Sequence, residues 1–505
     1  MAYSQSRLLT RAALIPGKRI DQSHALKNLG KKSESNQIFM NKNNIKPYTK
    51  GLKNKKVLVV GMAKTGLAAA QLLLKSGADV VAADTNVEKP VIQENAEKLQ
   101  KLGATIELGP HKSQTILNAD FIVISPGVPH TIKPLAKARQ NNIPVIGETE
   151  LAYRLTDIPI IAITGTNGKT TTTELIGDML KHSGKKVFVG GNIGTPFSEL
   201  ILSNQVYDIA VLEISSFQLD TIDTFCPDVA ILLNITEDHL NRYTEMAQYV
   251  ESKFNIFINQ QPDHKAILNG QDPYCIENFS KIHGKVYWLD HPQKKHQTID
   301  CNHNQIQAPN NSCFDLTQSP LTGHHNRQNI AAAILASQFM GGTDAGIQTS
   351  INSFKGLPHR LEYVDTMNGV TFYNDSKATN VDASIKALNC FDSPVHLILG
   401  GLDKGGDYSR LVPMLMKTVR ECILIGQART IIEKTFKSFK ELDHIPIHFS
   451  ETLEDAVIQA YTRAHSGEII LLSPACASFD MFDSYNHRGD IFKQTVRKRI
   501  VHTGE

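Results

Sequence analysis

The sequence predicts an α/β protein of about three domains built on parallel sheets. Its 505 residues are too many for one hydrophobic core, and about three domains of ordinary size are expected. Apolar, β-branched runs recur from residue 55 onward, and most are followed by a glycine-containing or polar turn and then a helical pattern. This alternation of strand and helix is typical of parallel sheets.

Composition favours a soluble protein in a reducing compartment. Hydrophobic residues make up 41% and charged residues 20% of the chain. No apolar run reaches the roughly 18 to 20 residues that a membrane span needs. The seven cysteines are widely spaced and odd in number, so they predict neither a disulfide framework nor a CxxC metal site. We therefore expect a cytoplasmic protein with no membrane span.

The net charge of +3 is distributed unevenly along the chain. Residues 1–50 carry ten Lys or Arg and two Asp or Glu, and therefore +8, which leaves −5 on the remainder. The acidic remainder argues against a nucleic-acid-binding protein. The basic segment 1–50 lacks a periodic apolar pattern, which favours a disordered extension; a targeting peptide or a basic arm for an anionic partner is the alternative.

The first ordered unit is predicted to be a βαβ unit with a glycine turn. A strand over 55–61 runs into the turn 62–66, a helix over 67–75 and a second strand over 78–83. A dinucleotide fingerprint would have glycine where Ala63 stands, at the point where the backbone approaches a pyrophosphate. Asp84 follows the second strand, where a ribose-binding acid is expected, so NAD and a related nucleotide diphosphate are both compatible.

A phosphate loop is predicted after the β-branched run 160–164. The loop reads Gly165-Thr166-Asn167-Gly168-Lys169-Thr170-Thr171, and a helical pattern follows it. Backbone N–H groups and the helix dipole would converge on a polyphosphate, Lys169 would neutralise its oxygens, and the Thr170 hydroxyl would ligate magnesium. Ile163 stands where the general pattern has its first glycine, so the match is imperfect.

Polar clusters follow the later strands of this unit. Asn192 follows a strand over 186–189, Glu213 ends an apolar run, and the segment 234–239 follows a strand over 228–233. Taken singly, Glu213 could be a structural acid and His239 a helix cap. Because ligands bind at the carboxyl ends of parallel strands, the clusters together predict one site beside the phosphate loop.

Two helices further along carry polar residues. A helix over about 246–258 carries Lys253 among aromatic residues, and a lone lysine on a helix is typical of a solvated charge. The segment 263–320 is less regular, with short strands and polar loops. The segment 323–329 then opens an Ala-rich helix whose first-turn amides and asparagines could hold a base or a phosphate, or simply cap the helix.

The last third of the chain is again α/β. A linker over 354–360 leads to strands over 370–374, 395–399, 421–425 and 468–472, and each ends in a glycine or a polar cluster. This domain therefore also offers a rim of ligand groups.

As a set, these motifs resemble those of the Mur ligases, the ATP-dependent amide-bond enzymes of peptidoglycan synthesis. The loop Gly165–Thr170 is that family's own form of the phosphate loop, which accounts for Ile163. Four further motifs occur in family order and at similar spacing: Glu213–Ser216, Asn234–His239, His325–Asn329 and Pro358–Arg360. Three others resemble the members that add D-glutamate to UDP-N-acetylmuramoyl-L-alanine: Ser215–Leu219, Asp375–Asn380 and Ser473–Ser478. The similarity runs from about residue 51 to the end.

The resemblance implies three domains that act on two small-molecule substrates. These are an N-terminal Rossmann-like domain for the UDP moiety at 51–148, a central P-loop-type parallel-sheet ATPase domain at 149–355, and a C-terminal Rossmann-like domain for the amino acid at 356–505. The substrates would be UDP-N-acetylmuramoyl-L-alanine and D-glutamate. We expect a cytoplasmic monomer that serves cell-wall biogenesis, cell shape and cell division.

The resemblance also implies the residues that act. The catalytic residues would be Lys169, Glu213, His239, Lys253 and Arg360. ATP would be bound by residues 165–171 with Asn326, Asn329, Arg360 and Asp375. One Mg²⁺ would be held by Thr170 and Glu213, and a second by His239 and Lys253, the lysine being carbamoylated by CO₂. The UDP substrate would contact Met62, Ala63, Lys64, Thr65, Thr85, Asn192 and His239. D-Glutamate would contact Lys377, Thr379, Lys404, Ser478 and Phe479.

Three alternatives compete with this expectation. Another amide ligase on the same scaffold, such as one resembling folylpolyglutamate synthase, is disfavoured by the opening βαβ unit and by the cluster 376–380. An NAD-dependent dehydrogenase with an accessory ATPase is disfavoured by Ala63. A non-catalytic nucleotide-binding protein is disfavoured because every expected polar group is present.

Overall fold

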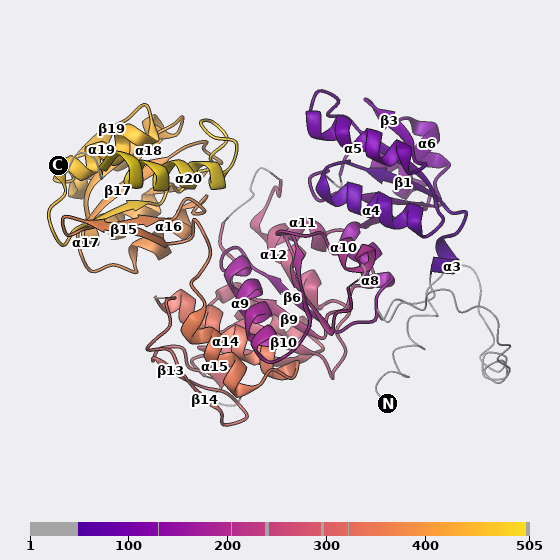
Figure 1. Ribbon diagram of the computed structural model, residues 1–505, viewed down its shortest axis with the longest axis horizontal. Helices are drawn as coiled ribbons and strands as arrows, with labels where there is room; N and C mark the ends of the chain where they lie inside the picture. Colours follow the sequence, from indigo (N-terminus) through magenta and orange to yellow (C-terminus); the bar gives the residue numbers. More distant parts are fainter. Residues whose placement is uncertain are drawn as a thin grey trace. The chain divides into compact units, whose positions relative to one another are not determined.

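Three parallel or mainly parallel sheets succeed one another along the chain (Figure 1). The structure is a computed structural model that describes residues 49–129, 131–203, 205–237, 242–293, 297–321 and 323–500. The predicted basic extension 1–50 lies almost wholly outside the described residues. The three-domain α/β fold class is confirmed, whereas the domain boundaries remain predictions.

The first sheet has five parallel strands in the order β3-β2-β1-β4-β5. Its strands are β1 (Lys56–Val60), β2 (Asp79–Asp84), β3 (Thr105–Leu108), β4 (Phe121–Ile124) and β5 (Val145–Gly147). Its helices are α3 (Thr49–Leu52), α4 (Lys64–Lys75), α5 (Pro90–Lys101), α6 (Ser113–Leu117) and α7 (Lys133–Gln140). The helix predicted from residue 67 begins at Lys64, so residues 64–66 of the predicted glycine turn belong to its first turn.

The second sheet has seven parallel strands in the order β12-β11-β10-β9-β6-β8-β7. Its strands are β6 (Ile160–Thr164), β7 (Val187–Gly191), β8 (Ile209–Glu213), β9 (Val229–Leu232), β10 (Lys265–Asn269), β11 (Lys285–Leu289) and β12 (Thr298–Ile299). Every residue of β6 and β8 is buried, as expected of strands covered on both faces. The segment predicted as irregular supplies β10 to β12, which continue the sheet as short strands between polar loops.

Helices cover both faces of this second sheet. One face carries α9 (Lys169–His182), α14 (His324–Phe339) and α15 (Asp344–Ser353), which lie side by side (Figure 1). The other face carries α8 (Glu148–Arg154), α10 (Ser198–Leu202), α11 (Ser216–Leu219) and α12 (Met246–Phe254). The helix predicted over 246–258 ends earlier, and a 3₁₀ turn η1 (Asn255–Phe257) follows it. A short helix α13 (Pro273–Asn278), a turn η2 (Phe279–Lys281) and the hairpin β13 (Gln305–Gln307) and β14 (Cys313–Asp315) complete this part.

The third sheet has six strands in the order β15-β16-β20-β17-β18-β19, of which only β15 runs antiparallel to its neighbour. Its strands are β15 (Glu362–Met367), β16 (Val370–Asn374), β17 (Val395–Gly400), β18 (Val419–Ile425), β19 (Ile447–Phe449) and β20 (Ile469–Leu472). One face packs on α16 (Val381–Leu388), α17 (Val412–Thr418) and α18 (Arg429–Lys437), and the other on α19 (Leu453–Arg463) and α20 (Tyr485–Thr495). Two 3₁₀ turns, η3 (Tyr408–Leu411) and η4 (Lys440–Leu442), and a π-helical segment η5 (Val496–Ile500) complete this part.

The carboxyl ends of four neighbouring strands of the second sheet lie along one edge. Strands β9, β6, β8 and β7 are neighbours and run in the same direction, so their polar carboxyl ends lie along one edge of the sheet. Among the described residues, no helix combines the length and the apolar character needed to cross a membrane.

Candidate active site

The phosphate loop joins β6 directly to α9. Gly165 and Gly168 both adopt positive φ angles, of 145° and 88°. A Cβ atom at Gly168 would lie only 2.5 Å from Asn329 Oδ1, so glycine is required there both for the turn and for this close approach. The Lys169 ammonium folds back over the loop and donates to the carbonyl oxygens of Gly165 at 3.0 Å and Thr166 at 2.9 Å.

Ile163 has a structural explanation. It is fully buried inside β6 and pairs with Glu213 of β8. Because the strand continues through Thr164, the turn begins two residues later than in the general pattern, and a β-branched core residue suits position 163 better than glycine.

Glu213 joins two other predicted site residues at the carboxyl edge of the sheet. The Thr170 hydroxyl donates to Glu213 Oε2 at 2.7 Å, and Asn192 Nδ2 donates to Glu213 Oε1 at 2.8 Å. A hydroxyl and a carboxylate are the oxygen donors that Mg²⁺ prefers, and Mg²⁺ is usually completed by substrate phosphates and water. Among the described residues, no group of three or more His, Cys, Asp or Glu is arranged to hold a metal ion.

Lys253 is not a solvated charge, so that sequence-based interpretation is wrong. Its side chain is 2% exposed, and its Nζ donates to Gly165 O at 2.9 Å and lies 4.5 Å from the centre of the Tyr249 ring. The helical pattern alone did not show that α12 turns this residue toward the phosphate loop. The other residue predicted for the second metal, His239, lies outside the described residues.

Three residues near the start of the third sheet lie close to the phosphate loop: Arg360, Asp375 and Lys377. Burial lowers the pKa of the Arg360 guanidinium, and the negative charges of Asp375 and Glu213 oppose this shift. Within the described part of the chain, its buried Nε atom has no hydrogen-bond partner. Lys377 Nζ donates to Thr170 Oγ1 at 2.8 Å. A half-buried cation with an unsatisfied buried donor, beside a second cation and the phosphate loop, is an arrangement suited to binding an anion.

Burial also shifts the pKa values of two of these groups. It lowers the pKa of Lys377 to about 7, with nearby Arg360 acting in the same direction and Glu213 opposing it. It raises the pKa of Asp375 to about 7, although Asp375 accepts hydrogen bonds from Ser473 Oγ at 2.9 Å and from the Leu361 amide at 3.0 Å.

A cavity of about 610 Å³ opens next to the loop. Its lining includes several predicted ATP-binding residues: Asn167, Gly168, Thr171, Asn326, Asn329, Arg360 and Asp375. Asn329 Nδ2 donates to Asn326 Oδ1 at 3.2 Å at the start of α14. His325 also lines the cavity, and burial lowers its pKa to about 4, so it is neutral at pH 7 and can pack against an uncharged ring.

The first glycine turn is held by Asp84. Asp84 accepts hydrogen bonds from the amides of Met62 at 2.7 Å and Asn86 at 2.8 Å, so both carboxylate oxygens are engaged within the protein. A dinucleotide ribose would have to compete with these bonds, which weakens the NAD interpretation. The Met62 side chain is fully buried, and its carbonyl accepts from Asn95 at 2.9 Å.

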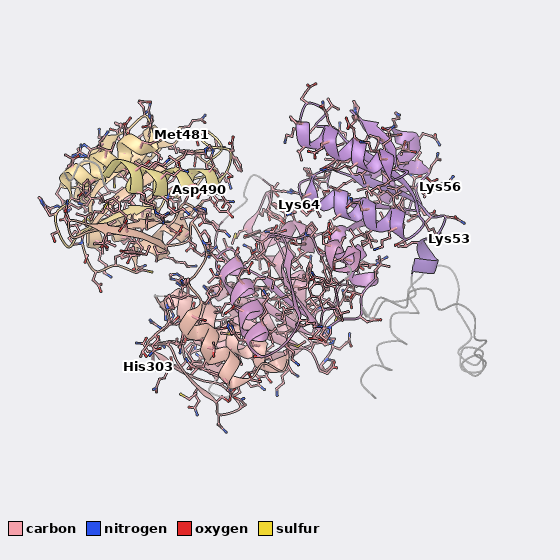
Figure 2. The ribbon with its side chains drawn as sticks, in the orientation of Figure 1. Lys53, Lys56, Lys64, His303, Met481 and Asp490 are labelled. Carbon is pink, nitrogen blue, oxygen red and sulfur yellow. The ribbon has the colours of Figure 1, made fainter. Side chains whose placement is uncertain are left out.

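The other residues predicted to contact the UDP moiety are at least partly exposed. Ala63 and Lys64 are exposed, Thr65 is half-buried, and Thr85 is exposed beside Asp84. Lys64, labelled in Figure 2, extends from the start of α4, and its Nζ donates to Gly194 O at 2.6 Å. It therefore reaches the loop that also carries Asn192.

The residues predicted for D-glutamate do not all line one pocket. Thr379 and Lys404 line one small pocket with Ala475 and Tyr408, whereas Lys377 lines the larger cavity. Ser478 is buried at 2% exposure, and Phe479 beside it is 68% exposed.

Sequence reasoning missed three residues that contact this region. Asn234 Oδ1 accepts from the Asn167 amide at 2.8 Å, and Asp382 Oδ2 accepts from Asn167 Nδ2 at 2.7 Å. The centre of the Tyr485 ring lies 5.5 Å from Lys377 Nζ. Asn234 was inside a motif already singled out, but nothing in the local sequence around Asp382 or Tyr485 indicated a role.

Models of three protein-family domains match most of the chain. The model of the Mur ligase MurD-like N-terminal domain matches residues 55–147, that of the Mur ligase middle domain matches 163–337, and that of the Mur ligase glutamate ligase domain matches 359–476. The chain belongs to the Mur ligase family.

Relatives named UDP-N-acetylmuramoylalanine–D-glutamate ligase align over almost their whole length. The one from Desulfosudis oleivorans is 44% identical over 449 residues, which is 88% of this chain and 96% of the relative. Those from Geobacter sp. strain M21 and Thermoanaerobacter sp. strain X514 are 43% and 41% identical, and each alignment covers 88% of this chain and 98% of the relative.

Solved structures share the Mur ligase fold at lower identity. A pseudomurein peptide ligase type C from Methanothermus fervidus is 21% identical with a TM-score of 0.55, over 88% of this chain and all of that one. UDP-N-acetylmuramate–alanine ligase MurC from Thermotoga maritima is 18% identical with a TM-score of 0.54, over the same shares. At these identities the likeness establishes the fold alone.

Proposed function

We propose that this protein is an ATP-dependent amide ligase that adds D-glutamate to UDP-N-acetylmuramoyl-L-alanine during synthesis of the peptidoglycan precursor. The observation that carries the proposal is the 41–44% identity, over nearly whole relatives, to proteins named for that reaction. The placement of Thr170, Glu213 and Lys253 around one phosphate loop supports it.

The proposed chemistry has two steps. A carboxylate oxygen of the alanyl group attacks the γ-phosphorus of ATP, so that a P–O bond to ADP breaks and an acyl phosphate forms. The amine of D-glutamate then attacks the acyl carbon and loses a proton, and inorganic phosphate leaves with the former carboxylate oxygen. Most of the catalysis consists of holding charge in place during phosphoryl transfer.

The cations around the loop would bind the phosphates of ATP. Lys169 and the loop amides would hold the β and γ groups, and Arg360 would contact the γ-phosphate. The buried Arg360 Nε atom, which has no hydrogen-bond partner among the residues that the structure describes, supports this role, because a phosphate oxygen would satisfy it. Asn326, Asn329 and Asp375, which line the cavity, would hold the adenosine.

The donor set at Thr170 and Glu213 fits Mg²⁺. Their oxygens lie 2.7 Å apart, and they are of the type and number that Mg²⁺ uses beside phosphate ligands. When bound, Mg²⁺ supplies charge neutralisation for the transferring phosphoryl group. For a second Mg²⁺, Lys253 would contribute as a carbamate formed with CO₂, together with His239. The burial of Lys253 against the loop supports this assignment, since an unmodified ammonium is not a metal ligand.

The two other substrates would bind on either side of the loop. The turn formed by Met62, Ala63, Lys64 and Thr65, with Thr85, would hold the uridine diphosphate. Asn192 and His239 would contact the muramoyl part of that substrate. D-Glutamate, with two carboxylates, would be held by Lys377, Thr379, Lys404 and Ser478, with Phe479 or Tyr485 packing alongside.

The biological setting follows from the chemistry of the substrates. A ligase that uses ATP and a nucleotide-linked precursor is expected to act in the cytoplasm. We propose that it works there as a monomer, and that cell shape and cell division depend on its product.

One assay tests the proposal against the other amide ligases of the scaffold. Phosphate release from ATP is measured with UDP-N-acetylmuramoyl-L-alanine and each candidate amino acid in both enantiomers. Release only with D-glutamate supports the proposal, and release with a different amino acid, or with none, refutes it. Lys169→Ala serves as the inactive control, because it removes the loop cation.

A further inference from the structure

Arg488 of α20 is a fully buried cation that lies between two loops, one at Ser376 and one at Cys476 and Ala477. Its side chain has no solvent exposure. Asp490, an exposed residue two positions further along the same helix, is labelled in Figure 2. Burial lowers the pKa of its guanidinium to about 10, so it remains charged at neutral pH. The proposed reaction gives this cation no role.

All three guanidinium nitrogens donate to the two loops. Nε donates to Ser376 Oγ at 2.9 Å and Nη2 to Ser376 O at 2.7 Å. Nη2 also donates to Cys476 O at 3.2 Å, and Nη1 donates to Ala477 O at 3.4 Å. The acceptors are three backbone carbonyls and the Ser376 hydroxyl, so uncharged polar groups stabilise the positive charge.

This arrangement requires arginine. Burying a charge is costly, and the cost is offset only when every donor has a well-placed acceptor. The planar guanidinium fork can reach two separate backbones at once, whereas a lysine ammonium is a single point of charge. Arg488 therefore holds the backbone at Ser376 at a set distance from the backbone at Cys476 and Ala477.

Both loops carry residues assigned to D-glutamate. Ser376 lies next to Lys377, and Ala477 lies next to Ser478. Ala475, which lines the pocket with Thr379 and Lys404, has a positive φ of 56° and needs support from its surroundings to keep that conformation. Ser376 Oγ also donates to the Tyr485 carbonyl at 2.8 Å, which ties the start of α20 to the same cluster.

We infer that Arg488 is a positioning residue that sets the spacing between the loop at Ser376 and the loop at Ala477, and so the geometry of the D-glutamate site. This inference rests on the proposed function, because it assumes that the amino acid binds between these loops. Loss of the clamp should weaken D-glutamate binding more than ATP binding, because the phosphate loop belongs to another sheet and meets the Ser376 loop through the Lys377 side chain.

The test compares Arg488→Lys with Lys493→Met. Lys493 is on the same helix and pairs with Glu362 and Asp490 at 3.3 Å, but it donates to neither loop. We expect Arg488→Lys to raise the KM for D-glutamate by about tenfold or more and to change the KM for ATP by less than about twofold. Lys493→Met should leave both KM values near those of the wild type.

Chemical rescue separates positioning from a general loss of structure. In Arg488→Ala, millimolar guanidinium should lower the KM for D-glutamate toward the wild-type value. If that variant does not fold, Ser376→Ala, which removes one acceptor, should raise the same KM selectively. An Arg488→Lys enzyme with an unchanged KM for D-glutamate, or with equal increases for D-glutamate and ATP, would overturn the inference. A wild-type enzyme that does not use D-glutamate would instead refute the proposed function.

Discussion

Lys253 Nζ lies 2.9 Å from the carbonyl oxygen of Gly165, which connects helix α12 to the first residue of the phosphate loop. The lysine is buried, and the Tyr249 ring on the same helix lies beside its ammonium group. A buried cation at a phosphate loop is costly unless it has a function or a strong partner. Because of this contact, we expect the chemistry of Lys253 to affect the nucleotide bound at the loop.

Replacement of Lys253 should inactivate the enzyme. We expect Lys253→Ala to lose about 100-fold or more in kcat, because a group that stabilises charge in the phosphoryl-transfer step is removed. If the lysine acts as a carbamate, acetate or formate added to Lys253→Ala should restore part of the rate. Steady-state phosphate release measures both effects, with Lys265→Ala of strand β10 as the matched control. Wild-type activity in Lys253→Ala would exclude the role.

Glu213 should govern the requirement for magnesium. Glu213→Gln keeps the size of the side chain but removes the charge next to Thr170, so the Mg²⁺ concentration at half-maximal rate should rise by about tenfold or more. The comparison is with Glu251→Gln, an exposed residue on α12. An unchanged magnesium dependence in Glu213→Gln would remove Glu213 from the metal site.

The D-glutamate site should depend on Ser478 and on one of two aromatic residues. Ser478→Ala should raise the KM for D-glutamate by about tenfold, and more than the KM for ATP, because a hydrogen bond to a charged carboxylate is lost. Tyr485→Leu and Phe479→Leu then distinguish the rings. Since Tyr485 lies beside Lys377 and Phe479 is 68% exposed, we expect the larger increase from Tyr485→Leu. The opposite order would favour the sequence-based assignment of Phe479.

The sequence was sufficient to predict the fold and the phosphate loop, because both depend on local patterns. Strand β6 and the glycines of the loop are neighbours in sequence. Glu213 comes at the end of an apolar run that predicts a strand by itself. Lys253 is different, since only tertiary packing decides which face of α12 is buried. Tyr485 is separated from Lys377 by more than a hundred residues, and no local pattern joins them. Short strands were predicted in the segment that holds β10 to β12, but they were not assigned to the central sheet. β12 has only two residues, too few to show a strand pattern in the sequence.

Glu148 provides a pH-dependent test of the junction between the first two sheets. It is buried at the start of α8, its Oε1 accepts from the Ser198 amide, and its Oε2 has no partner among the described residues. Burial raises its pKa from 4.5 to about 7. Between these values the folded protein keeps a proton that the unfolded chain has lost, so the free energy of unfolding falls as pH rises and levels off above about 7.

Glu148→Gln should remove this pH dependence. The glutamine stays neutral, so the variant should gain up to about 3 kcal/mol over the wild type between pH 4 and pH 8. Urea unfolding at a series of pH values measures the difference, and Glu97→Gln, an exposed residue on α5, serves as the control. A difference between wild type and Glu148→Gln that is the same at every pH would contradict the raised pKa.

The most direct test of the ligase chemistry follows the oxygen atoms of the acceptor. UDP-N-acetylmuramoyl-L-alanine labelled with ¹⁸O in both oxygens of its alanyl carboxylate is incubated with the wild-type enzyme, Mg·ATP and D-glutamate, and the released phosphate is analysed by mass spectrometry. An acyl phosphate predicts that each phosphate carries one ¹⁸O atom and that the amide product keeps the other. Phosphate free of ¹⁸O would show that ATP does not activate this carboxylate, and would contradict the proposed function.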